Sequence, residues 1–301
     1  MAAISVADLV KHYGDVRAVD GVSFHVAEGE VYALLGENGA GKSTTVEILE
    51  GHRSRTSGSV EVLGTDPGQA AREFRDRIGI VLQRSGVEDE LTVAEAVNVY
   101  GACYRRRRDT TEVIELVDLA SQADRRIGAL SGGQRRRLDL ALGIVGRPAL
   151  LFLDEPTTGF DPAARRNAWE LVRQLCSGGT TVLLTTHYLD EAEHLADRVG
   201  VLARGRLVAE GTPAELVGGG ATKVGFVLPD GVSVEDLRGV IPGDAALVGD
   251  RVEFTTATPT AAVHELTGWA LACDRELVGL TVERPSLEDV FLSMASGAAT
   301  S

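Results

Sequence analysis

Short apolar runs alternate with longer amphipathic stretches over the first 211 residues of the chain. Residues 31–35, 149–153 and 181–185 consist almost entirely of apolar or β-branched side chains, a pattern typical of strands buried inside a parallel sheet. A helical pattern follows the first run at residues 41–50, and another lies at residues 162–176 with apolar side chains three and four positions apart. This alternation predicts a parallel sheet covered by helices, the arrangement of an α/β domain.

The pattern changes twice along the chain and divides it into domains. Within the α/β domain of residues 1–211, residues 88–146 have a mostly helical pattern, which predicts an inserted helical subdomain. A Thr-Pro pair and three consecutive glycines indicate a linker at residues 212–220. We expect residues 221–296 to form a small α+β domain and residues 297–301 to be a frayed tail. The elements predicted in the small domain are strands at residues 223–228, 251–257 and 277–284 and a helix at residues 260–269.

Composition and charge restrict the classes of function. The chain has no uninterrupted apolar run of about 18 residues and no basic-then-apolar N-terminus, so we expect a cytoplasmic protein without a membrane span or signal peptide. The net charge of −14 opposes binding to nucleic acid, which is itself a polyanion. We interpret two basic runs, residues 105–108 and 135–137, as solvated faces, and a contact with a membrane partner or with anionic lipid stays open for both. The three widely separated cysteines indicate reduced thiols.

The strongest chemical motif lies between the first predicted strand and the first predicted helix. Its sequence, Gly-Glu-Asn-Gly-Ala-Gly-Lys-Ser, fits the pattern G-x-x-x-x-G-K-[ST]. Glycines let the backbone curl around a phosphate so that several N–H groups point inward, at the positive end of a helix dipole. Lys42 adds a charge for the β- and γ-phosphates of a nucleotide, and the Ser43 hydroxyl can ligate Mg²⁺. The predicted phosphate-binding residues are Gly36, Glu37, Asn38, Gly39, Ala40, Gly41, Lys42, Ser43 and Thr44.

Two carboxylates emerge at the end of the apolar run at residues 149–153. Open α/β sheets bind their ligands at the carboxyl ends of the strands, so this position favours a role in a site. Asp154 can hold the shell of a Mg²⁺ ion through water. Its neighbour Glu155 can orient and polarise the water that attacks a γ-phosphate, which is the positioning role that phosphoryl transfer needs.

A third motif, Leu-Ser-Gly-Gly-Gln at residues 130–134, opens a helical pattern shortly before that strand. Ser131 and Gln134 match the capping box S-x-x-Q, which would explain both side chains as helix caps. Capping does not explain Gly132 and Gly133, because glycine is a poor helix former. Exposed N–H groups at the start of a helix also form an anion site, and the two interpretations can hold together.

The order of these elements resembles that of the nucleotide-binding subunits of ATP-binding-cassette (ABC) transporters. By this resemblance residues 36–43 are the Walker A loop, residues 130–134 the signature motif and residues 150–155 the Walker B strand. The family more often has Leu where Phe160 stands. The resemblance further implies Tyr13 as the aromatic that stacks on adenine, Gln83 as the Q-loop glutamine that senses the metal and contacts the membrane partner, Asp161 as the D-loop aspartate and His187 as the switch histidine.

The resemblance implies a P-loop ATPase cassette with ATP and Mg²⁺ as cofactors, the metal being held by Ser43, Gln83 and Asp154. In this family ATP lies between the Walker A loop of one subunit and the signature motif of the other. One chain carries one of each, so two copies, or this chain and a similar one, must face each other head to tail. Closure around ATP and reopening after hydrolysis would then drive a separate integral-membrane permease.

Residues 284–292 resemble the closing motif of the daunorubicin-resistance branch of ABC exporters, and residues 135–140 resemble the same branch. The branch implies export of a hydrophobic compound or antibiotic by a subunit peripheral on the inner face of the cell membrane. It also implies a role in dimer stability and regulation for residues 221–296. The alternatives are a soluble ABC ATPase acting on ribosomes or DNA, which usually has a second cassette or a long coiled coil, and a regulatory ATP switch, against which the intact Glu155 and His187 argue.

Overall fold

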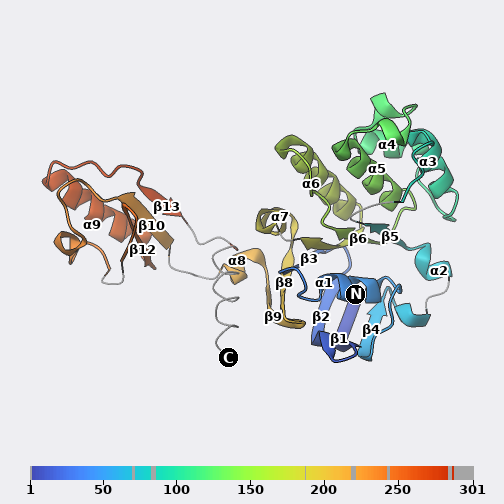
Figure 1. Ribbon diagram of the computed structural model, residues 1–301, viewed down its shortest axis with the longest axis horizontal. Helices are drawn as coiled ribbons and strands as arrows, with labels where there is room; N and C mark the ends of the chain where they lie inside the picture. Colours follow the sequence, from blue (N-terminus) through green and yellow to red (C-terminus); the bar gives the residue numbers. More distant parts are fainter. Residues whose placement is uncertain are drawn as a thin grey trace. The chain divides into compact units, whose positions relative to one another are not determined.

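The structure is a computed structural model that describes residues 2–69, 72–82, 86–186, 188–217, 222–242, 245–283 and 287. The chain divides into two compact units, Met1–Pro213 and Ala214–Ser301 (Figure 1). Two of the predicted site residues, Gln83 and His187, lie outside the described residues, as does all of the predicted closing motif except Leu287. Among the helices that the structure describes, none is both long and apolar enough to cross a membrane.

A six-stranded sheet is the centre of the first unit. Five strands are parallel, and the sixth pairs antiparallel with its neighbour at one edge. The three strands predicted from apolar runs are confirmed and lie side by side in this sheet, so the predicted α/β class is also confirmed. In spatial order the strands are β5 (Ile78–Val81), β6 (Leu150–Asp154), β7 (Thr181–Thr186), β3 (Val31–Gly36), β8 (Arg198–Ala203) and β9 (Arg206–Gly211).

Most helices of the first unit follow strands of this sheet or lie in the segment between β5 and β6. The predicted helices at residues 41–50 and 162–176 are confirmed as α1 (Lys42–Leu49) and α6 (Pro162–Ser177). Residues 88–146, all of them described, contain α3 (Val93–Gly101), α4 (Thr110–Leu116) and α5 (Gly132–Ile144) and no strand. Among the described residues of the unit, the remaining helical segments are α2 (Arg72–Arg75), α7 (Leu189–Leu195) and three 3₁₀ turns at Pro67–Gln69, Ala120–Gln122 and Ile127–Ala129.

A second sheet of the first unit was not predicted from the sequence. It is antiparallel, in the order β2 (Val16–Ala27), β1 (Ala2–Tyr13) and β4 (Ser57–Val62). The register between β1 and β2 shifts at several places, and Asp8 has a positive φ of 49°. These irregularities interrupt the two-residue alternation by which such strands are recognised.

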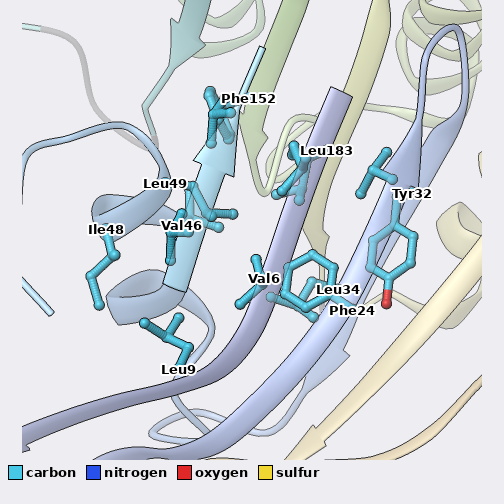
Figure 2. Close-up of a cluster of buried hydrophobic side chains, with 14 of the residues drawn as sticks. Val6, Leu9, Phe24, Tyr32, Leu34, Val46, Ile48, Leu49, Phe152 and Leu183 are labelled. Atoms are coloured by element: carbon cyan, nitrogen blue, oxygen red, sulfur yellow. The ribbon is translucent and has the colours of Figure 1, made fainter. Parts of the chain in front are cut away.

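The hydrophobic core between the two sheets encloses α1 (Figure 2). Val6, Leu9 and Phe24 reach it from the antiparallel sheet, and Ile48 and Leu49 from α1. Since burial of one large aliphatic side chain contributes about 1.5–3 kcal/mol, the contacts of α1 with both sheets hold this helix firmly. The core also contains Tyr32 and Leu34 of β3, Val46 of α1, Phe152 of β6 and Leu183 of β7.

The second unit is a four-stranded antiparallel sheet covered by one long helix. Its elements are β11 (Ala246–Val248), β12 (Arg251–Thr256), β10 (Thr222–Val227) and β13 (Thr281–Glu283) in spatial order, the helix α9 (Pro259–Ala272) and a 3₁₀ turn at Val234–Leu237. The alternation in the predicted strand at residues 251–257 is confirmed, because Val252, Phe254 and Thr256 are buried.

Two elements near the second unit differ from the predictions. The strand predicted at residues 277–284 is described only as β13, because residues 277–280 form a turn in which Gly279 has a φ of 64°. Within the stretch predicted as a linker, Pro213–Leu216 form the short helix α8.

Candidate nucleotide-binding site

The loop between β3 and α1 depends on glycine at two positions. A Cβ atom at Gly36 would lie 2.5 Å from the carbonyl oxygen of Leu202, and one at Gly41 would lie 2.4 Å from that of Ala18. Gly41 also has a φ of 103°, and Gly39 has a φ of 83°, a region that residues with a side chain rarely adopt. The packing of this chain therefore requires glycine at positions 36 and 41 and gives the loop one defined course.

Lys42 is the buried cation of this loop, with 7% of its surface exposed. Its Nζ donates hydrogen bonds to the carbonyl oxygens of Gly36 at 2.6 Å and Glu37 at 3.0 Å. Burial lowers the pKa of Lys42, while the neighbouring charges of Glu155 and Asp154 oppose that shift. The fold thus brings the lysine of the first motif and the two carboxylates of the second motif together.

The carboxylates at the end of β6 are held by the adjacent strand β7. The Thr185 hydroxyl donates to Asp154 Oδ1 at 2.5 Å, and the backbone N–H of Glu155 donates to the carbonyl oxygen of Thr185 at 2.9 Å. Glu155 has a φ of 47°, so the chain leaves the strand abruptly at this residue. The Thr158 hydroxyl donates to Glu155 Oε2 at 3.3 Å. Both carboxylates are partly exposed, and they can act on a phosphate or a water bound beside Lys42.

The start of α5 has a different construction. Gln134 donates its backbone N–H to the Ser131 hydroxyl at 3.3 Å, and its side-chain oxygen accepts from the Ser131 N–H at 3.0 Å. The predicted capping box is therefore present. A Cβ atom at Gly132 or Gly133 would meet nothing within 4 Å, so the packing of this chain does not require either glycine. Ser131 and Gly132 are exposed.

Asp161, predicted as the D-loop aspartate, lies at the N-terminus of α6. Asp161 caps α6, because one of its oxygens accepts the backbone N–H groups of Ala163 and Ala164, each at 2.9 Å. The bond from Ala164, and then that from Ala163, lowers the pKa of Asp161. Phe160, the departure from the family pattern, is buried against Ala164 and Ala168, so the larger ring is accommodated within this chain.

Tyr13 is the last residue of β1 and exposes 40% of its surface. The Nζ atom of Lys11 lies 5.0 Å from the centre of its ring, and the Arg53 guanidinium lies 5.3 Å from it. An exposed ring with two cations close to it can stack on a flat base while the cations attract phosphate.

The structure identifies two residues of this region that the sequence did not. Glu50, next to the C-terminus of α1, is buried; desolvation and the charge of Asp154 raise its pKa to about 8. The interpretation of residues 135–137 as a solvated face is wrong for Arg136. Its side chain is buried and donates hydrogen bonds to backbone carbonyls. The sequence gives no signal of burial at Arg136, which lies between two other arginines, and a single glutamate after Ile48 and Leu49 does not by itself indicate burial at Glu50.

An Mg²⁺ ion usually takes one or two oxygen ligands from the protein and the rest from phosphate and water. The exposed Ser43 hydroxyl and the partly exposed Asp154 carboxylate are such ligands. The described residues of the site therefore fit a magnesium-bound nucleotide.

Comparison with known proteins agrees with this geometry. Residues 19–158 match the family described as ABC transporter, and residues 222–286 match the C-terminal domain of ABC transporter domain-containing protein-like sequences. The daunorubicin resistance ATP-binding protein DrrA2 of Streptomyces coeruleorubidus is 42% identical over 97% of this chain and 94% of its own length. The Nod factor export ATP-binding protein I of Rhizobium sp. (strain N33) is 40% identical over 97% of this chain and 96% of its own length.

Among solved structures, the fold is similar to the dimeric structure of MJ0796, a bacterial ABC transporter cassette, with a TM-score of 0.62 and 26% identity over 69% of this chain and 98% of that one. A phosphate loop, a glycine pair at a helix start and a strand ending in two carboxylates follow one another along this chain. The chain belongs to the ATP-binding subunits of the ABC transporter family, which bind and hydrolyse ATP, and its near relatives include the daunorubicin resistance proteins.

Proposed function

We propose that this chain is the motor subunit of an ABC exporter, coupling ATP-driven closure of a head-to-tail dimer to efflux of a hydrophobic compound or antibiotic through a separate permease. The observation that carries the catalytic part is that Lys42 and the carboxylates of Asp154 and Glu155 meet at one edge of the sheet, because β3, which leads into the loop of Lys42, and β6, which ends at Asp154, both pair in parallel with β7. The export direction rests on the relatives, whose names refer to daunorubicin resistance and to Nod factor export.

Within the ATP site, we assign the binding of the β- and γ-phosphates to Lys42 and to the N–H groups of residues 36–44. Lys42 Nζ would exchange its bonds to the Gly36 and Glu37 carbonyls for phosphate oxygens. Tyr13 would stack on the adenine, and Gln83 and His187 keep the roles that the family resemblance implies.

A Mg²⁺ ion, held by Ser43, Asp154 and Gln83, would neutralise charge on the transferred phosphoryl group. Glu155 would orient the attacking water by accepting its hydrogen bond. The Thr185 bond to Asp154 and the fixed backbone of Glu155 support these assignments, since they hold both carboxylates in place.

The second copy is proposed to contribute its signature segment, Ser131–Gln134, to this ATP. The open space around Gly132 and Gly133 supports this role, because a nucleotide from outside the chain could approach the backbone there. Asp161 would cross the same interface. The solved cassette similar to this chain is described as dimeric, which also favours pairing. We assign residues 221–296 a role in stabilising and regulating the pair.

The permease is proposed to dock beside the segment around Gln83. A cavity of about 800 Å³ supports this, because it is open at the surface between the end of α1, β5 and the helices α3 and α5. Tyr100, Tyr104 and Leu142 line it on the helical side, and Val81 and Leu82 on the sheet side. Docking there would hold the chain at the inner face of the cell membrane.

Purification of the tagged chain from native membranes in mild detergent tests this proposal. We expect a polytopic membrane protein to accompany it and to stimulate its ATPase activity. Recovery with ribosomes, with DNA or with no partner would contradict the transporter role while leaving the ATPase intact.

A further inference from the structure

One arginine of α5 binds the backbone where the Walker B strand ends. Arg136 exposes 6% of its surface. Its Nε donates to the carbonyl oxygen of Pro156 at 3.1 Å, and its Nη2 donates to those of Asp154 at 2.5 Å and Glu155 at 2.8 Å. Its Nη1 donates to the carbonyl oxygen of Leu82. Four carbonyl groups from two loops therefore converge on one side chain.

These carbonyls belong to the ends of two neighbouring strands. β5 and β6 are parallel, with Val81 paired to Leu153, so Leu82 and Asp154 follow at the same edge of the sheet. The Arg136 guanidinium bridges both ends. A planar fork with five donors can serve several acceptors at once, whereas a lysine has three donors on a single nitrogen.

The arrangement fixes Glu155 from both sides. Its N–H donates to the Thr185 carbonyl of β7, and its own carbonyl accepts from Arg136 of α5. Between these two bonds Glu155 adopts a φ of 47°, in the left-handed region that residues with a side chain seldom occupy. Such a conformation persists only where the surroundings determine it. These two bonds contribute to this, together with the bond that the Thr158 N–H donates to the Glu155 carbonyl at 3.3 Å.

The charge of the guanidinium is balanced locally. Asp139, one turn further along α5, lies 3.8 Å from Arg136 Nη1 and is also buried. Burial lowers the pKa of Arg136, and the carboxylates of Asp139 and Asp154 oppose that shift. A cation is thus maintained directly behind the backbone of the catalytic segment.

We propose that Arg136 is a positioning residue for ATP hydrolysis, which holds the backbone of Glu155 so that its carboxylate stays aligned on the attacking water. The inference rests on the role proposed for Glu155. It gives α5 a function in the chain's own ATP site, in addition to the proposed contact of its exposed start with the ATP of a second copy. The residue acts through Glu155 and does not itself touch ATP.

Arg136→Gln tests the proposal, with Arg173→Gln as a matched control. Arg173 also donates to a backbone carbonyl, that of His194, but lies on α6 at the surface. We expect Arg136→Gln to lower kcat about 100-fold, because a shift of about 1 Å in a catalytic group can cost that factor. Affinity for a fluorescent ATP analogue should stay that of the wild type, and the control should change neither quantity. An unchanged kcat, or a loss of affinity equal to the loss of kcat, would overturn the proposal.

A second variant and a chemical rescue separate positioning from general destabilisation. Arg136→Lys keeps the cation with fewer donors, so its kcat should lie between those of the wild type and Arg136→Gln at an unchanged unfolding temperature. Millimolar guanidinium should partly restore the kcat of Arg136→Ala and leave that of Arg173→Ala unaltered. Rescue by ammonium to the same extent as by guanidinium, or full activity in Arg136→Lys, would count against the planar fork.

The Glu155→Gln background distinguishes this proposal from that of the dimer. With ATP, Arg136→Gln combined with Glu155→Gln should associate as Glu155→Gln alone does, because the start of α5 has its own capping box. Loss of association only in the double variant would assign Arg136 to the start of α5 and overturn the proposal. If Glu155→Gln itself did not associate, the dimer proposal would fail, whereas the kcat of Arg136→Gln would still decide the role of Arg136.

Discussion

Glycine pairs precede α1 and open α5, and the two pairs differ in the space that surrounds them. In the loop that joins β3 to α1, Gly36 and Gly41 have no room for a Cβ atom, because carbonyl oxygens of Leu202 and Ala18 lie against them. At the start of α5, Gly132 and Gly133 have open space around them. The first pair is required by the fold of this chain. The second pair lowers the stability of its own helix, and no contact within the chain requires it. This indicates that a molecule outside the chain requires these glycines.

The largest effect is expected at Glu155, which is proposed to act on the ATP that the starts of α1 and α5 bind. Glu155→Gln should lower ATP turnover by about 10²–10⁴-fold, the usual contribution of a positioned acid or base, while ATP still binds. Phosphate release under saturating ATP measures the first quantity, and titration with a fluorescent ATP analogue measures the second. Turnover at the wild-type rate would remove Glu155 from its role.

Lys42→Ala tests the region at α1 by itself. A charge-assisted hydrogen bond contributes about 1.5–3 kcal/mol, so the affinity for ATP should fall by about 10–100-fold. Arg53→Ala, beside Tyr13 rather than in the loop, should weaken binding far less. Equal affinity in Lys42→Ala and the wild type would mean that residues 36–43 are not the phosphate loop.

Replacing one glycine of each pair by alanine tests directly whether the fold requires that pair. Gly41→Ala should lower the unfolding temperature and the affinity for ATP, because the new Cβ clashes with Ala18 and φ is 103°. Gly133→Ala should keep both or gain up to about 1 kcal/mol in the free energy of unfolding, since alanine is the better helix former. Thermal unfolding and ATP titration of both variants decide the matter. A Gly133→Ala chain as unstable as Gly41→Ala would show that the second pair also serves the fold.

A further prediction concerns the pH dependence of stability at the other end of α1, where Glu50 is buried. Its pKa is about 8 in the folded chain against 4.5 for the free side chain, so the folded state binds more protons between these values. The contribution of Glu50 to the free energy of unfolding should therefore fall as the pH rises from about 4.5 to about 8. Glu50→Gln should remove this part of the pH dependence and be relatively more stable at pH 8. Parallel pH profiles of urea unfolding for the two chains would contradict the assignment.

The sequence predicted what depends on local patterns. The strands β3, β6 and β7 are continuous apolar runs, and the loop before α1 carries a motif with few alternative meanings. The antiparallel sheet was missed because shifts in register interrupt its alternation. Arg136 was assigned to solvent because the sequence does not reveal that α5 packs against both the other helices and the carbonyls of Leu82 and Glu155. Burial of a charged side chain depends on such distant partners, which no local pattern contains.

The most direct test of the account is the mass of Glu155→Gln in solution, with and without Mg²⁺ and ATP, beside the same chain with Gly133→Asp added. We predict that ATP converts the first protein from monomer to dimer and leaves the second as a monomer that still binds ATP, because a charged side chain would then stand where the phosphates of the other copy must lie. Dimers of both proteins, or monomers of both, would contradict the claim that the start of α5 completes the ATP site of a second copy.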